Sequence, residues 1–167
     1  MALSPERAGS EEAAKEAALR ILERGPRTER EIHGRLRERG YHENAVERAI
    51  ERLRRVSLLD DRAFVRSFLR TELFKAPQGK RLLVLKLRRR GVPDALIGEL
   101  DGFLDQDPDL SSRSLASEEG RAALGFAQLR RRYARLEGEA YRRRMQAALQ
   151  RRGFDWDTIR DLLREES

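Results

Sequence analysis

Cysteine is absent from the 167-residue sequence, and this absence excludes disulfides, thiolate metal sites and cysteine nucleophiles. Long apolar runs are missing as well. The longest, Leu82–Leu85, is far shorter than the roughly 20 residues that a membrane span needs. The first residues also lack the apolar segment of a signal peptide. We therefore expect a cytoplasmic protein that makes no contact with a membrane.

Groups that carry chemistry are scarce. The two histidines, His33 and His42, have no other ligands nearby in the sequence, so we expect surface or capping roles for them. Asp60 and Asp61 have no partner at a useful spacing and are interpreted as helix caps, not as an acid–base pair. Gly79–Arg81 lacks the Ser or Thr of a phosphate-binding loop. The sequence thus indicates no catalytic residue, no metal and no cofactor.

Charge is abundant instead. Lys and Arg number 36 against 29 Asp and Glu, and the charged share equals the hydrophobic share at 39%. This balance favours small helical units over a single thick core. The net charge of +7 suggests a polyanion or an acidic protein surface as partner. Nearly all basic residues are Arg, whose fork suits phosphates and carboxylates, although genome composition can produce the same enrichment.

A short helix-ending pattern occurs three times. In each copy an apolar residue is followed by a second one four positions later, then by Arg and directly by Gly. The copies are Ile32, Leu36, Arg39, Gly40; Leu83, Leu87, Arg90, Gly91; and Met145, Leu149, Arg152, Gly153. The apolar pair marks one face of a helix, and Gly after a basic last turn marks the end of that helix. The pattern predicts three copies of one helical unit.

Helical periodicity continues on both sides of each Gly, and no segment alternates as a strand does. The sequence therefore predicts an all-α protein of three tandem three-helix repeats. The predicted segments are a flexible start at 1–11, repeat 1 at 12–59, repeat 2 at 60–104, an acidic linker at 105–113 and repeat 3 at 114–167.

Some helices are predicted in more detail. Thr28 and Glu31 form a capping-box pattern at the start of a helix. One helix is expected to continue from Val92 to Phe103, and the long helix after the linker is expected to continue to Gly138.

Aromatic residues near the end of the chain have two interpretations. We expect Trp156 to anchor the core of the last repeat together with Phe154 and Ile159. The other interpretation is that a nucleic-acid base stacks on Trp156 or Tyr133.

Several short motifs together resemble one known family. They are Leu58–Asp61 with Phe64, then Gly79–Arg81, then Leu87–Gly91 and finally Leu149–Phe154. Each motif alone is weak, but their order, their spacing and the threefold repeat make the set specific. In these features the sequence resembles the RecX family of bacterial recombinase regulators. Ser57 stands where that family usually has Gly, and Lys80-Arg81 stands where a Pro-Arg pair is common.

The resemblance implies a fold, partners and an activity. It implies an elongated, bent array of three three-helix repeats that binds the RecA recombinase filament on single-stranded DNA. It also implies inhibition of strand exchange, ATP hydrolysis and coprotease function by a protein with no catalytic residues. We expect a monomer, with non-specific duplex DNA as a further partner.

The basic charge is concentrated in the middle third. Residues 60–104 have a net charge of +4, against +2 for 1–59 and +1 for 105–167. In this part of the chain, acids at helical i, i+4 spacing do not neutralise the excess. The candidate residues for binding the partner or DNA are Lys80, Arg81, Lys86, Arg88, Arg89, Arg130, Arg131, Arg132, Arg142 and Arg143. For Arg39, Arg90 and Arg152, a solvated helix end is the favoured interpretation.

Two other functions are considered. One is a stand-alone, repressor-like DNA-binding protein. The acidic Glu43, Glu47 and Glu51 on a third helix disfavour it, because a helix that reads the major groove should be basic or amide-rich. The other is a scaffold that binds an acidic protein partner without nucleic acid.

Overall fold

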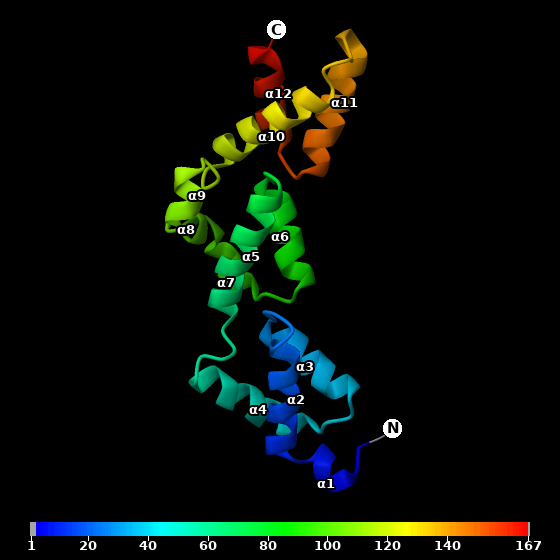
Figure 1. Cartoon of the computed structure of the whole chain (residues 1–167), viewed down its shortest axis with the longest axis vertical. Coiled ribbons are helices and arrows are strands. Elements are labelled where there is room, and N and C mark those ends of the chain that lie inside the picture. Colours follow the sequence, from blue (N-terminus) through cyan, green and yellow to red (C-terminus); the bar gives the residue numbers. More distant parts are fainter. Residues whose placement is uncertain (1–2, 167) are drawn as a thin grey trace. The chain divides into compact units, whose positions relative to one another are not determined.

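The computed structural model describes residues 3–166, and within this range the chain is α-helical with no strand (Figure 1). The predicted all-α class is confirmed. Three groups of helices correspond to the three repeats. The first group is α2 (Glu11–Leu22), α3 (Glu29–Glu38) and α4 (Glu43–Arg55). The second is α5 (Asp61–Lys75), α6 (Lys80–Arg89), α7 (Asp94–Gly98) and α8 (Leu100–Asp105). The third is α10 (Glu118–Arg132), α11 (Gly138–Arg151) and α12 (Trp156–Glu165).

The chain divides into two compact units, and the boundary falls inside α5. Unit 1 extends to Val65 and also takes in the loop Arg89–Pro93. Unit 2 takes Arg66–Arg88 and the described chain from Asp94 onward. Among the described helices, none is both long enough and apolar enough to cross a bilayer.

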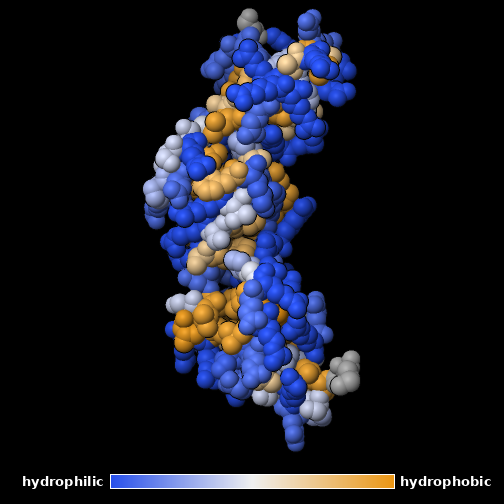
Figure 2. All heavy atoms as spheres, viewed as in Figure 1, coloured by the Kyte–Doolittle hydropathy of each residue, from blue (hydrophilic) through white to orange (hydrophobic). Residues whose placement is uncertain are grey.

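Unit 1 has a small core between α2, α3 and α4. Its fully buried members include Ala14 and Ala18 of α2, Ile32 and Leu36 of α3, and Val46 of α4. The small alanines let α2 lie close against α4. Apolar residues also remain on the surface: Val56 and Leu58 are 60% and 56% exposed. Figure 2 shows a patch of apolar side chains over this end of α4.

Helix ends follow the predicted chemistry. Thr28 Oγ1 accepts from Glu31 N at 3.1 Å, and Glu31 Oε2 accepts from Thr28 N at 3.2 Å, which confirms the capping box. Asp60 Oδ1 accepts from the Arg62 and Ala63 amides at 2.8 and 3.1 Å and so caps α5 as expected.

The repeated glycines also end helices as predicted. Gly40, Gly91 and Gly153 have φ values of +92°, +78° and +85°, a region in which Gly carries no steric penalty. In the first and third copies, the amide after Gly bonds the carbonyl five residues before it, in the Schellman arrangement. The helix stop read from the sequence is therefore confirmed.

The loop that follows α6 is an integral part of unit 1. Thr28 Oγ1 donates to Arg90 O at 2.6 Å, and Arg90 Nη2 donates to Glu31 Oε2 at 3.1 Å. The Arg90 guanidinium also lies 4.8 Å from the ring centre of Phe64. Although partial burial opposes it, the bonds from Arg90 and Thr28 N keep the pKa of Glu31 below its ordinary value. Arg90 is thus an internal contact, and its interpretation as a solvated helix end is wrong.

Unit 2 contains an equivalent joint. Gly79 N, just before α6, donates to Arg152 O at 2.8 Å, and Gly153 lies against the backbone of Leu82. In both units, the loop after the second helix of one repeat packs on the start of the second helix of the preceding repeat. The repeated Arg-Gly therefore serves two purposes, because it ends a helix and forms a joint.

Two segments predicted to lack structure are folded. Within the predicted flexible start, α1 (Pro5–Ala8) begins at its cap Ser4, and Ala8 O accepts from His42 N at 2.8 Å; residues 1–2 of that segment lie outside the described range. Within the predicted linker, α9 (Pro108–Ser112) is capped by Asp107, and Leu110 is fully buried. Asp, Ser and Pro were interpreted as loop signals, but here they form a helix cap followed by Pro in the first turn.

Two predicted helices differ in length. The helix expected at 92–103 is interrupted at Glu99, where an i→i−3 bond to Leu96 O replaces the regular pattern between α7 and α8. The helix expected to reach Gly138 ends at Arg132, and Tyr133 leaves the helical conformation.

Asp61 offers a test of stability against pH. It is almost fully buried and accepts from Glu29 N at 2.9 Å. Burial, with help from the charges of Glu29 and Asp60, raises the pKa of Asp61. A raised carboxyl pKa means that the charged form destabilises the folded state at neutral pH.

Asp61→Asn keeps an acceptor oxygen and removes the charge. We expect the variant to melt at a higher temperature than the wild type at pH 7. The difference should disappear below about pH 4, where the unfolded carboxyl is also protonated. Thermal unfolding between pH 3 and 8 checks this, and a variant less stable than the wild type at pH 7 would contradict it.

Candidate functional site

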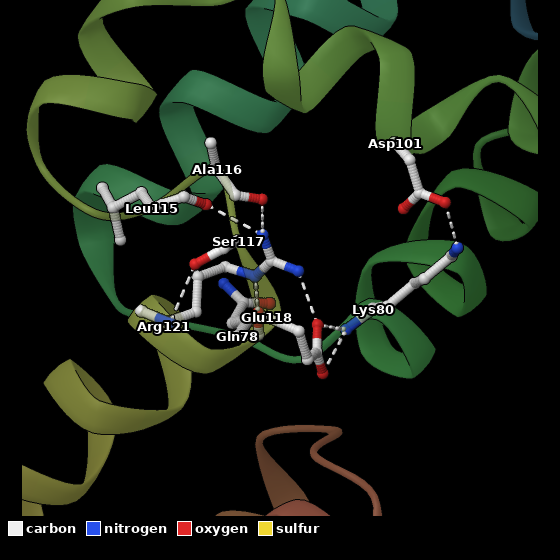
Figure 3. Close-up of polar contacts among 9 residues, drawn as sticks. Gln78, Lys80, Asp101, Leu115, Ala116, Ser117, Glu118 and Arg121 are labelled. Atoms are coloured by element: carbon white, nitrogen blue, oxygen red, sulfur yellow. Dashed lines mark hydrogen bonds and ion pairs between the residues drawn. The ribbon is translucent and has the colours of Figure 1, made fainter.

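The basic helix α6 begins at a site built by α10. Glu118 of α10 accepts from Lys80 N at 3.1 and 3.3 Å, which gives the start of α6 an external carboxylate cap (Figure 3). This cap and the Gly79–Arg152 bond place the first turn of α6, and with it Lys80 and Arg81, beside the last repeat.

Arg121 holds this arrangement from the interior. Its side chain is nearly inaccessible, with 1% of the residue exposed. Nε donates to Gln78 O at 2.9 Å, Nη1 donates to the Leu115 and Ala116 carbonyls at 2.8 and 2.5 Å, and Nη2 lies 2.5 Å from Glu118 Oε2 (Figure 3). Glu118 is therefore shared between the buried guanidinium and the start of α6. Sequence reasoning missed Arg121, because its burial depends on the carbonyls of Gln78, Leu115 and Ala116, which only the fold brings to it.

A groove of about 1260 Å³ opens next to this cluster, and we call it the α6 groove. Its walls come from α6, α8, α10, the end of α11 and the start of α12. In addition to Arg121, the basic residues that line the groove are Lys80, Arg81, Arg88 and Arg151. Its apolar lining includes Leu85 and Trp156, which are 44% and 52% exposed. The groove therefore combines guanidinium groups with accessible apolar surface.

Three of the predicted cations on α6 have acidic partners. Lys80 Nζ lies 2.6 Å from Asp101 Oδ2, and Arg88 Nε lies 3.0 Å from Asp94 Oδ1. Lys86 is half-buried outside the groove, where it pairs with Glu72 and donates to Gln78 Oε1 at 2.7 Å. The bond from Lys86 lowers the pKa of Glu72. None of these acids lies at i, i+4 spacing from its partner, so the compensation of these three residues comes from acids elsewhere in the chain, which local spacing does not predict.

The other two predicted cations of α6 differ, because no acidic partner in the described chain compensates their charge with an ion pair. Arg81 and Arg89 are exposed, and within residues 3–166 neither forms an ion pair with a carboxylate. Arg81 lines the α6 groove, whereas Arg89 lies outside it. Arg151, which was not among the candidates, joins Arg81 in the groove and is likewise without an ion pair in the described chain.

The candidates in the last repeat lie outside the α6 groove. Arg130 pairs with Glu166 at 3.2 Å, and Arg143 pairs with Glu139 at 2.5 Å on an exposed face. The other three, Arg131, Arg132 and Arg142, are exposed. The structure thus gathers Lys80, Arg81 and Arg88 in one place and leaves the remaining predicted residues elsewhere.

The prediction that Trp156 anchors a core is wrong. Trp156 is the first residue of α12, directly after the cap Asp155, and lies open to solvent in the groove. Bonds from the Thr158 amide and side chain lower the pKa of the Asp155 carboxyl. Phe154 and Ile159 are buried as expected, while Tyr133 packs against the core of the last repeat.

The two histidines do not build a metal site. His33 Nε2 lies 2.5 Å from Glu43 Oε1 on the surface, and His42 precedes α4 without a side-chain cap bond. Across the described part of the chain, His, Asp and Glu side chains form no cluster that could hold a metal ion.

These features define a helical-repeat protein with an arginine-rich groove. Comparison with family models assigns each helical group. Residues 14–53 match the first three-helix domain of RecX, residues 60–100 the second and residues 118–163 the third.

Individual relatives agree with the domain assignment. The chain is 35% identical to regulatory protein RecX of Mycolicibacterium smegmatis, over 93% of this chain and 80% of that protein. It is 34% identical to the RecX of Mycobacterium sp. strain JLS, over 93% and 82%. The crystal structure of RecX from Lactobacillus salivarius has the same fold, with a TM-score of 0.73 at 21% identity over 93% of this chain and 95% of that one. The chain belongs to the RecX family of regulatory proteins.

Proposed function

We propose that this protein binds the RecA filament on single-stranded DNA and inhibits its recombinase activities, namely strand exchange, ATP hydrolysis and coprotease function. The observation that carries the proposal is membership of the RecX family through all three domains. The α6 groove supports it, because exposed guanidinium groups suit the phosphates and carboxylates of a nucleoprotein surface.

ATP hydrolysis by a recombinase filament tests the proposal directly. The rate on single-stranded DNA is measured with increasing amounts of this protein. We expect the rate to fall until the filament is saturated, and the fall to require more protein as salt is raised. An unchanged rate, at amounts that co-sedimentation shows to saturate the filament, would disprove the inhibitory function.

The basic face of α6 is tested by replacing Lys80, Arg81, Arg88 and Arg89 with Ala. We expect binding to preformed filaments to weaken by about 10- to 100-fold at low salt, because counterion-releasing contacts are lost. Helicity should remain, since the broken ion pairs are exposed and contribute within about 1 kcal/mol each. Co-sedimentation over a salt series and circular dichroism measure the two effects.

The matched control removes the same charge from unit 1. It replaces Arg20, Arg24, Arg48 and Arg55 with Ala, all of which are exposed. If the control weakens binding as much as the α6 variant, net charge alone explains the effect. The basic residues of α6 would then be interpreted as a solvated helix face that does not bind the partner.

A further inference from the structure

Trp156 is unusual among the exposed residues of unit 2. Its indole is 52% exposed at the start of a well-formed helix, although burying it would remove a large apolar surface from water. The neighbouring Phe154 is 1% exposed and fills the adjacent core. The packing of the last repeat is therefore completed without Trp156, and the fold leaves its ring accessible in the α6 groove.

The charges around the indole favour an anionic ligand. Three acids of the groove already have partners: Glu118 binds Arg121 and the Lys80 amide, Asp101 binds Lys80, and Asp155 caps α12. Asp105 is the remaining acid. Arg81 and Arg151 have no ion pair in the described chain, although the charge of Arg81 helps to lower the pKa of Asp155. Two guanidinium groups of the same groove therefore remain available to a ligand.

We propose that the α6 groove is a single-stranded nucleic-acid subsite, in which a base stacks on Trp156 and flanking phosphates bind Arg81 and Arg151. A groove that holds both an aromatic face and cationic groups can bind both the bases and the phosphates of a single strand. A duplex keeps its base faces stacked inside and cannot offer them to the indole. The subsite deepens the proposed function, since it names where the strand of the filament contacts this protein.

The volume of the groove is consistent with a polymeric ligand. Its volume of about 1260 Å³ exceeds that of sites for drug-sized ligands, which are about 300–1,000 Å³. An acidic peptide could engage Arg81 and Arg151 but would leave the planar indole face without a complementary partner. Nucleic acid uses both kinds of group, and for this reason we choose it as the occupant.

Intrinsic fluorescence isolates this site, because Trp156 is the single tryptophan of the chain. The full-length protein is titrated at low salt, without recombinase, with an oligothymidylate of about 12 nucleotides. We expect saturable quenching of the indole emission. An abasic strand of equal length, whose binding is followed by anisotropy of an attached dye, should bind through its phosphates and quench much less.

Variants separate stacking from charge. Trp156→Leu should weaken binding of the dye-labelled strand about 10-fold or more, and Arg81→Ala or Arg151→Ala should reduce the salt slope by about 0.7 each. The matched control is Phe74→Leu. Phe74 is also an exposed aromatic residue of unit 2, 46% accessible under the guanidinium of Arg113, but it lies outside the groove. Its substitution should leave affinity unchanged, and circular dichroism confirms that each variant is folded.

Three results would overturn the subsite. They are strand binding without a change in emission, no strand binding in the absence of recombinase, and quenching by an acidic peptide that displaces the strand. The last would assign the groove to a protein partner. These results leave the proposed function open to a separate test. If the protein inhibits ATP hydrolysis by the filament but the strand does not quench Trp156 emission, only the subsite is rejected.

Discussion

Arg121→Met is expected to lower the free energy of unfolding by about 3–5 kcal/mol, the range for removing one member of a buried charged network. The methionine fills similar space but leaves the Gln78, Leu115 and Ala116 carbonyls without their donor. Glu118 also loses its cationic partner, so the cap of α6 should loosen. Urea unfolding followed by circular dichroism gives the loss as a lower midpoint.

The matched control for this change is Arg130→Met on the same helix. Arg130 pairs with Glu166, but its side chain is 69% exposed, so we expect an effect within about 1 kcal/mol. Equal midpoints for the two variants would show that the guanidinium of Arg121 does not stabilise unit 2 in the way its contacts indicate.

Gly153→Ala is expected to destabilise unit 2 by about 3 kcal/mol or more. The residue has φ +85°, where an L-residue costs about 1–2 kcal/mol. A Cβ atom would also lie 2.6 Å from Leu82 N, and a backbone atom cannot move aside as a flexible side chain can. The joint between the Gly153 loop and α6 should therefore open, and the α6 groove should be lost with it.

Gly98→Ala is the matched control, and its effect on stability is expected to be neutral or favourable. Gly98 is helical, and a Cβ atom there meets nothing within 4 Å. We expect no loss of stability, or a gain of up to about 1 kcal/mol from the better helix propensity of Ala. Thermal unfolding of both variants makes the comparison. A Gly153→Ala protein as stable as the Gly98→Ala protein would show that the joint tolerates a side chain.

Much of the fold could be predicted because it rests on local contacts. The capping box of Thr28 and Glu31 and the left-handed glycines depend on residues within one turn of each other. The same local rules failed at 105–113, where Asp107 and Pro108 were interpreted as a loop. They form a helix start, because tertiary burial of Leu110 and a bond from Arg70 stabilise it.

The candidate site was predictable only in part. Placement of Lys80, Arg81 and Arg88 on one basic helix followed from the sequence. The other wall of the groove did not, because Arg151 and Trp156 are about 70 positions further along the chain. Apolar periodicity also could not assign Trp156, since the first residue of a helix is free to point away from its buried face.

The sequence by itself determined the all-α class, the three repeats, their family and the helix ends at Gly40, Gly91 and Gly153. Hydrogen bonds and apolar spacing within a few residues are sufficient for the class, the repeats and the helix ends, whereas the family followed from the resemblance of short motifs. Only the tertiary structure decided which charges are compensated, that Arg121 is buried and that Trp156 is exposed. Those outcomes depend on side chains that are distant in the sequence and that only folding brings together, such as Lys80 with Asp101 and Lys86 with Glu72.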